Sequence, residues 1–174
     1  AGIDPASAEI IHPNNVKRVI RALEYAKQTG EPISAHNEAQ RKKESPYLYR
    51  YYVLNKDRNK LYESINKRVD IMIEKGLVDE VKRLTDMGYT KDLVSMQGLG
   101  YKEIIDYLEG KYTLEEAIYT LKRDTRHYAK RQLTWFRREK EVVWINKDDF
   151  KRDEDILEFI LEDLRQWGIT NYFN

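Results

Sequence analysis

The sequence predicts an α/β fold that is strand-poor and mainly helical, and two patterns predict it. Apolar residues recur every three to four positions along most of the 174 residues, which is the spacing of amphipathic helices. Only residues 47–54 and 141–145 are rich in the aromatic and β-branched side chains typical of strands. We expect these two strands to lie in one sheet. With 41% hydrophobic residues, the chain can bury one core and a small helical annex.

The composition excludes several classes of site. The chain has no cysteine, so it holds no disulfide or thiolate metal site, which fits a reducing cytoplasm. Its three histidines lack the spacing of zinc ligands. No apolar run is long enough to cross a bilayer, and the beginning of the sequence does not resemble a secretion signal. Because the chain begins without Met, we expect it to be a piece of a longer protein.

The first 47 residues are expected to form two helices and a polar loop. Asp4 and Pro5 indicate a helix start, and Asn14 or Asn15 caps a second helix over residues 16–28 that ends at Gly30. The loop is expected over residues 31–47. Three cations near the start of the second helix oppose its dipole: Lys17, Arg18 and Arg21. A bound anion would remove that conflict, although a solvated surface explains the cations equally well.

The middle of the chain alternates helices with glycine stops. After the strand over residues 47–54, Asp57 caps a helix over residues 58–75. A short helix over residues 77–87 follows. Gly98 and Gly100 then precede another helix, where they allow close backbone approach and free N–H groups attract anions. A simple tight turn explains the two glycines as well. The last helix, over residues 153–167, is expected to serve packing.

The segment over residues 122–138 gathers positive charge, although the whole chain carries only +1. Seven basic residues stand there against one acid, Asp124. Thr113 and Glu116 form a capping box that begins a helix through this segment. We expect Trp135 and Phe136 to be in the core and the cations to contact phosphates. A solvated basic face remains the alternative. The seven are Lys122, Arg123, Arg126, Lys130, Arg131, Arg137 and Arg138.

Four stretches, in order, resemble one enzyme family. They are I-H-P-N-N-V-K-R (residues 11–18), L-Y-E-S-I-N-K-R-V-D (61–70), M-Q-G-L-G-Y-K-E (96–103) and T-R-H-Y-A-K-R-Q-L-T-W-F-R (125–137). Together they resemble the tRNA dimethylallyltransferases, the isopentenyl transferases of the bacterial type. The chain departs from that pattern at Ser64, where family members often carry a basic residue, and we assign Ser64 no role.

The resemblance implies a domain plan and an activity. Residues 1–45 would end a helical insertion domain, and residues 46–174 would form the C-terminal part of a P-loop NTPase-like core. The family's phosphate-binding loop and catalytic Asp lie in an N-terminal half expected to precede Ala1. We therefore assign no catalytic residue here, and we expect this chain alone to be inactive. The complete enzyme would transfer a dimethylallyl group from dimethylallyl diphosphate to N6 of the adenosine 3′ of the anticodon in tRNA.

The resemblance also implies sites and partners. Arg68 would help to hold the donor diphosphate, although pairing with Asp70 or Glu74 on the surface is the alternative. Mg2+ would be bound mainly by the missing half. The expected partners are the tRNA anticodon stem-loop and dimethylallyl diphosphate, with no membrane, for a cytoplasmic monomer. The residues expected to bind tRNA are Lys17, Arg18, Arg21, Gln97, Gly98, Gly100, Tyr101, Lys102, Arg126, Lys130, Arg131, Gln132, Thr134, Trp135 and Arg137.

Two other classes of function remain open on the residues alone. A non-catalytic RNA-binding module would use the same basic helix over residues 122–138 and would bind tRNA tightly without a partner half. A helical interaction domain would bind a protein and would have no salt-dependent affinity for RNA. The sequence has no complete catalytic motif with which to choose among them.

Overall fold

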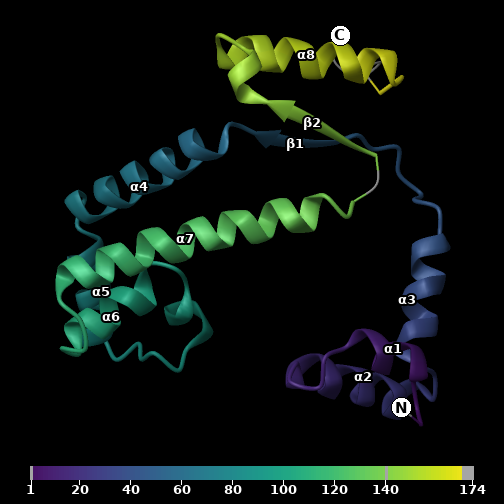
Figure 1. Cartoon of the computed structure of the whole chain (residues 1–174), viewed down its shortest axis with the longest axis horizontal. Helices are drawn as coiled ribbons and strands as arrows, with labels where there is room; N and C mark the ends of the chain where they lie inside the picture. Colours follow the sequence, from purple (N-terminus) through teal and green to yellow (C-terminus); the bar gives the residue numbers. More distant parts are fainter. Residues whose placement is uncertain (1, 140, 170–174) are drawn as a thin grey trace. The chain divides into compact units, whose positions relative to one another are not determined.

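The computed structural model describes residues 2–139 and 141–169, which form two compact units (Figure 1). Of the described residues, those up to Leu48 belong to the first unit and those from Tyr49 onward belong to the second. The described part is mainly helical with a single two-stranded sheet, so the predicted strand-poor α/β class is confirmed.

The first unit contains three short helices, α1 (Pro5–Ile10), α2 (Val16–Thr29) and α3 (Ile33–Lys42). Asp4 joins two of them, because its carboxylate accepts a hydrogen bond from the Ser7 N–H at 2.9 Å and from the Ser34 N–H at 3.0 Å. The Ser34 hydroxyl donates to the same carboxylate at 2.7 Å. These hydrogen bonds, led by that of the Ser34 hydroxyl, hold the pKa of Asp4 well below its usual value.

Helix α3 corrects the predicted polar loop over residues 31–47. Its sequence is polar, and local propensity gave little reason to expect a helix there. Tertiary contacts supply that reason, since Asp4 binds the first turn through Ser34. His36 also packs against Tyr25 of α2, with 5.1 Å between the ring centroids. The predicted starts of α1 at Pro5 and α2 at Val16 are confirmed, as is Gly30 in the left-handed conformation at the end of α2.

The second unit contains the predicted sheet, made of β1 (Tyr51–Asn55) and β2 (Val142–Asn146). The strands are parallel, and Tyr51 pairs with Val142 at one end of the register. Residues 47–50, which were predicted to belong to the first strand, lie outside it. The sheet is shorter than predicted because strand pairing needs a partner, and β2 pairs with only these five residues of β1.

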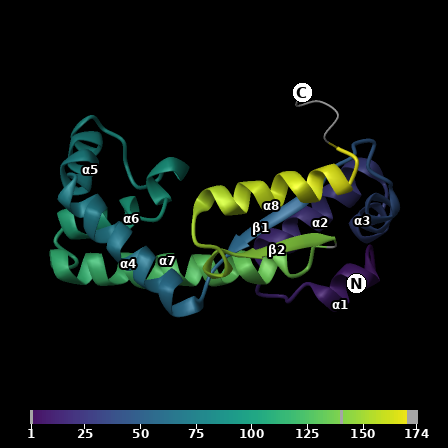
Figure 2. The same ribbon diagram turned by 90° about the horizontal axis from the view of Figure 1, so that it is seen from above.

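Helices form most of the second unit (Figure 2). The bounds of these helices lie close to the predicted ones. The core that they enclose includes Val81, Ile104 and Leu121, each 0% or 1% exposed. Helix α7 packs against both α4 and α6 in this core. The elements are α4 (Arg58–Glu74), α5 (Leu77–Asp86), the 3-10 turn η1 (Val94–Gln97), α6 (Tyr101–Leu108), α7 (Leu114–Phe136), the 3-10 turn η2 (Lys147–Asp149) and α8 (Asp153–Gln166).

Helix α8 is attached to the sheet by a polar cluster. The Asp163 carboxylate accepts hydrogen bonds from Arg50 Nε at 2.8 Å, from Arg50 Nη2 at 3.2 Å and from the Tyr52 hydroxyl at 2.6 Å. The Arg50 guanidinium also lies 4.4 Å from the centroid of the Trp167 ring. Burial, together with the hydrogen bond to Asp163, raises the pKa of Tyr52 to about 12. These contacts hold α8 beside β1, and its expected role in packing stays a prediction.

Candidate nucleic-acid interface

Helix α7 carries the basic segment, and its first turn forms as predicted. The Thr113 Oγ1 atom accepts the Glu116 N–H at 3.2 Å, while Glu116 Oε2 accepts the Thr113 N–H at 2.8 Å. This reciprocal capping box satisfies two backbone donors that a helix start leaves unpaired. Ala117 and Leu121 are buried in the core. The early turns of α7 are thus fixed in place, so the later turns project from a rigid support.

The first three cations of the basic segment are engaged within the protein. Lys122 Nζ lies 2.6 Å from Asp70 Oδ1, and Arg126 Nη1 donates to Asn66 Oδ1 at 2.6 Å. Both partners lie on α4, so these contacts fix α7 against that helix. Arg123 pairs with its neighbour Asp124 at 2.9 Å. Arg126, which was expected to bind tRNA, is half-buried and already has a polar partner.

The other four cations, Lys130, Arg131, Arg137 and Arg138, are exposed, and we call them the basic end of α7. Within residues 2–139 and 141–169, none of them pairs with a carboxylate. The Arg131 guanidinium lies 5.7 Å from the Tyr128 ring centroid, an arrangement that leaves its charge accessible. Two further residues expected to bind tRNA, Gln132 and Thr134, are also exposed here. This end of the helix therefore concentrates uncompensated positive charge.

The expectation that Trp135 belongs to the core is wrong, because this residue is 53% exposed. Phe136 is half-buried and packs edge-on against Tyr51 of β1, with 6.0 Å between the ring centroids. Trp135 in turn stands edge-on to Phe136 at 5.2 Å. Phe136 thus anchors the end of α7 to the sheet, while Trp135 presents apolar ring surface beside the basic end of α7.

The Gly98–Gly100 turn is more self-contained than expected. Gly100 has a φ of 102°, which disfavours any side chain, whereas Gly98 has an ordinary φ of −63°. The Gly100 N–H donates to the buried Glu103 carboxylate at 2.8 Å. The N–H groups of the next two residues donate to the Gly98 carbonyl. These three donors are therefore not free for an anion, contrary to the expectation.

The side chains around this turn are also engaged. The Tyr101 hydroxyl donates to Glu80, which raises the pKa of Tyr101. Lys102 Nζ lies 3.2 Å from Glu103 Oε1 and 3.7 Å from Asp124 Oδ2. Gln97 is exposed, and its amide donates to the backbone carbonyl of Lys91 at 3.3 Å. Any contact of Lys102 with a phosphate would compete with two carboxylates.

The remaining predicted residues lie on other helices, α4 and α2. Arg68 is exposed on α4. Its suggested partner Asp70 pairs with Lys122 instead, and no ion pair of Arg68 occurs among the described residues. In the first unit, Lys17, Arg18 and Arg21 are exposed on α2. The N-cap residue of that helix is Asn15, but its side chain makes no capping hydrogen bond, contrary to the expectation that Asn14 or Asn15 caps the helix.

A cavity of about 390 Å³ opens at the carboxyl end of the sheet, beside the basic end of α7. Lys130, Thr134 and Arg137 line it from α7 and the residue after it. Lys56 and Arg58 line it from the start of α4, and sequence reasoning missed both. A signal was present, because N-K-D-R directly follows a strand, and ligands collect at the carboxyl ends of parallel strands.

Residues 2–139 and 141–169 contain no group of three or more His, Asp or Glu side chains placed to hold a metal ion. This part of the chain thus does not fit a Mg2+ site of its own. No helix in the same ranges combines the length and the apolar character that a membrane span requires.

Comparison with known proteins agrees with the resemblance. A curated tRNA dimethylallyltransferase of Lachnoclostridium phytofermentans is 64% identical over 88% of this chain and 49% of its own length. One of Acetivibrio thermocellus is 55% identical over 96% of this chain and 53% of its own. The chain thus spans about half the length of these curated relatives.

Solved structures and a family model give the same result. The full-length tRNA isopentenylpyrophosphate transferase of Bacillus halodurans has a TM-score of 0.67 and 48% identity over 96% of this chain and 51% of that one. A tRNA delta(2)-isopentenylpyrophosphate transferase of Staphylococcus epidermidis has a TM-score of 0.68 and 40% identity over 95% and 54%. The family model described as IPP transferase matches residues 1–139. The chain therefore belongs to the IPP transferase family.

Proposed function

We propose that the protein containing this chain transfers a dimethylallyl group from dimethylallyl diphosphate to N6 of the adenosine 3′ of the anticodon in tRNA. The chain's own part in that reaction is to bind the anticodon stem-loop and hold it in place, and we call this binding the grip. The names of the curated relatives support the reaction. The observation that carries the chain's role is the basic end of α7, where four exposed cations have no carboxylate partner among the described residues.

The anticodon loop must be held because the target adenosine is not accessible while it is stacked. An adenosine amine within a stacked anticodon loop is sterically blocked, so the base must leave the stack to reach an alkyl donor. Lys130, Arg131 and Arg137 would hold the backbone phosphates. Gln132 and Thr134 would donate to phosphates or bases, and Trp135 would offer its exposed ring to an unpaired base.

The donor site is only partly represented in this chain. Arg68 is exposed and has no ion-pair partner among the described residues, so its guanidinium is available for the donor diphosphate. Mg2+ belongs to the proposal only through the family, and its ligands would come from outside the described residues. When bound, the ion would screen the leaving diphosphate. We expect this chain alone to lack transfer activity, and we place the whole protein in the cytoplasm as a monomer.

Binding of RNA to the 174-residue chain tests the grip. An unmodified anticodon stem-loop carrying a fluorescent label would be titrated at two salt concentrations, beside a hairpin of equal length and unrelated loop. We expect selective binding that weakens with salt. Lys130→Ala combined with Arg131→Ala should weaken it and should lower the slope of log K against log salt by roughly two, one for each lost phosphate contact.

The matched control combines Lys67→Ala with Lys82→Ala. These two lysines are exposed and lie outside the basic segment over residues 122–138, and replacing both removes the same amount of charge. Circular dichroism would verify that both double variants remain folded. Unchanged affinity of the Lys130 and Arg131 variant at low salt would refute the grip. Equal binding of both hairpins would favour a non-catalytic RNA-binding module, whereas no salt-dependent binding of RNA would favour a protein-interaction domain.

A further inference from the structure

We propose that the cavity at the carboxyl end of the sheet is a phosphate-binding pocket formed by Lys56, Arg58, Lys130 and Arg137. These four cations line one cavity of about 390 Å³ and come from two separate parts of the chain. Lys56 follows β1, and Arg58 is the first residue of α4. Lys130 and Arg137 are seven residues apart, which is about two helical turns and places both on one side of α7.

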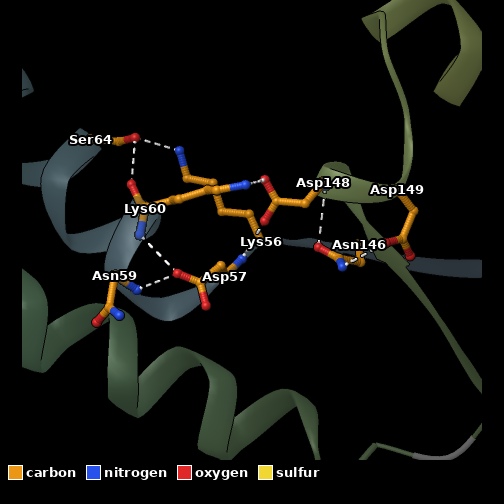
Figure 3. Close-up of polar contacts among 8 residues, drawn as sticks. All are labelled: Lys56, Asp57, Asn59, Lys60, Ser64, Asn146, Asp148 and Asp149. Carbon is orange, nitrogen blue, oxygen red and sulfur yellow. Dashed lines mark hydrogen bonds and ion pairs between the residues drawn. The ribbon is translucent and has the colours of Figure 1, made fainter.

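The four cations of the pocket are available to bind an anion, because the partners of Lys56 and Arg58 are neutral hydroxyl groups. In the close-up, Lys56 contacts the Ser64 hydroxyl (Figure 3). Arg58 Nε donates to the Tyr62 hydroxyl at 3.1 Å, and that hydroxyl can still donate its own proton. Across the described residues, none of the four pairs with a carboxylate. Lys60 in the same view differs, because its ammonium lies 2.8 Å from Asp148 and it does not line the cavity.

The one carboxylate that lines the cavity, Asp57, offsets only one of its four positive charges. Asp57 Oδ1 accepts the backbone N–H groups of Asn59 at 2.9 Å and Lys60 at 3.2 Å, so it serves as the cap of α4 (Figure 3). The free N–H groups of Asn59 and Lys60 at the helix start are therefore already paired, and the side-chain cations are the groups available to an anion. Four like charges around one hollow repel each other, and an anion with several oxygens would relieve that repulsion.

The shape and chemistry of the cavity favour phosphate. Guanidinium groups bind phosphate oxygens in a bidentate manner, and two of the four cations are arginines. The Asn55 amide and the Tyr62 hydroxyl add neutral donors at the wall, while Leu61 and Leu133 supply apolar surface. The volume lies within the usual range of small-ligand sites, roughly 300–1,000 Å³. A phosphate group of RNA and a free diphosphate both meet these requirements.

The inference rests on the proposed function for the RNA source of the phosphate, because the RNA backbone would reach the pocket along the basic end of α7. It adds Lys56 and Arg58 to that surface. The diphosphate source does not depend on RNA binding, so the two proposals can fail separately.

The experiment uses the 174-residue chain and two probes, the labelled anticodon stem-loop and inorganic diphosphate followed by calorimetry. Lys56→Gln combined with Arg58→Gln removes two of the four cations from the pocket. We expect it to weaken binding of at least one probe about tenfold or more at low salt. If RNA is the ligand, the slope of log K against log salt should also fall by roughly two.

Lys67→Gln controls for the loss of one exposed charge, because Lys67 is exposed on α4 beyond Arg58 and has no carboxylate partner among the described residues. Arg58→Lys keeps the charge but loses the planar fork, so it should bind less well than the wild type and better than the double variant. Circular dichroism and a thermal melt would establish that each variant is folded.

The binding results distinguish between the two sources of phosphate, RNA and free diphosphate. Loss confined to the stem-loop identifies RNA phosphate, and loss confined to diphosphate identifies a free diphosphate. Each supports the pocket. Diphosphate binding that depends on Lys56 and Arg58, together with no selective RNA binding, would keep the pocket and refute the proposed grip. The pocket is refuted if the wild-type chain binds neither probe, or if the double variant binds both as tightly as Lys67→Gln does.

Discussion

The pKa of a carboxyl group in this protein depends on its hydrogen-bond partners, and Asp163 is the best example. Its carboxylate receives two hydrogen bonds from Arg50 and one from the Tyr52 hydroxyl. The bonds from Arg50, followed by that from Tyr52, lower the pKa of Asp163 below its usual value. Partners also decide which cations of α7 are available for other contacts, because Lys122 has an acidic partner and Lys130 has none among the described residues.

The lowered pKa of Asp163 leads to a prediction about pH. A carboxyl group whose pKa is lowered by folding stabilises the folded state above its unfolded pKa, about 3.9, and the stabilisation is lost as pH falls through the folded value. Asp163→Asn should therefore be less stable than the wild type near neutral pH. That deficit should shrink as pH falls below about 4, because the wild type then also loses the charge. Urea unfolding at several pH values would measure it.

Asp92→Asn is the control for this prediction, since Asp92 is exposed and has no ionic partner among the described residues. Other carboxylates with lowered pKa values, such as Asp106 and Asp148, are present in every variant and cancel in the comparison. A deficit for Asp163→Asn that stays constant from neutral to acidic pH would contradict the assigned role of the charge.

At the scale of elements, α7 is one continuous helix with two different surfaces. Its first half is capped, buried at Ala117 and Leu121, and joined to α4 through Lys122 and Arg126. Its second half reaches the sheet, where Phe136 packs against Tyr51. The helix thus runs from the core to the sheet, and its Lys130, with Arg137 just after it, lines the cavity that Lys56 and Arg58 also line.

The cap of α7 gives a prediction at this scale. Thr113→Ala removes the hydroxyl that accepts the Glu116 N–H, and it should lower the free energy of unfolding by about 1 kcal/mol. Urea unfolding followed by circular dichroism would measure the change. Thr113→Ser keeps an accepting hydroxyl and should retain most of the stability. A loss in Thr113→Ser as large as that in Thr113→Ala would show that the methyl group, rather than the cap, is responsible.

At the scale of the whole molecule, the chain divides into two compact units after Leu48. The irregular stretch between α3 and β1 belongs to neither a helix nor a strand, and it follows Arg41, Lys42 and Lys43. Exposed segments without regular structure are the preferred sites of proteolytic cleavage. The predicted domain boundary between residues 45 and 46 lies in this stretch, and the identity of the two domains stays a prediction.

Limited trypsin digestion should therefore cleave first near residues 41–50, followed by slower cleavage elsewhere. Mass spectrometry should find an early fragment that begins in this stretch and contains α4 to α8, because those elements share contacts within one unit. Replacing Lys42 and Lys43 with Gln should slow the first cleavage at those two sites. First cleavage inside α7, which is anchored to the core, would contradict the division into these two units.

Local patterns made much of the fold predictable. Asp57 and Thr113 cap the helices that they were predicted to cap, because a side-chain oxygen close to free N–H groups acts within one turn. Gly30 ends its helix because only glycine adopts the left-handed conformation at little cost. Helix α3 was missed because its stabilising contacts with Asp4 and Tyr25 come from residues distant in the sequence.

By itself, the sequence determined the limits of most helices other than α3, the presence of two strands in one sheet and the family, since these follow from caps, periodicity and short motifs. Only the tertiary structure decided which cations are free. Lys102 and Arg126 are held by side chains on other elements, whereas Lys130 and Arg137 remain without carboxylate partners in the described part of the chain. The physical reason is that Coulomb and hydrogen-bond partners depend on distance in space. A linear count of charge cannot contain that distance.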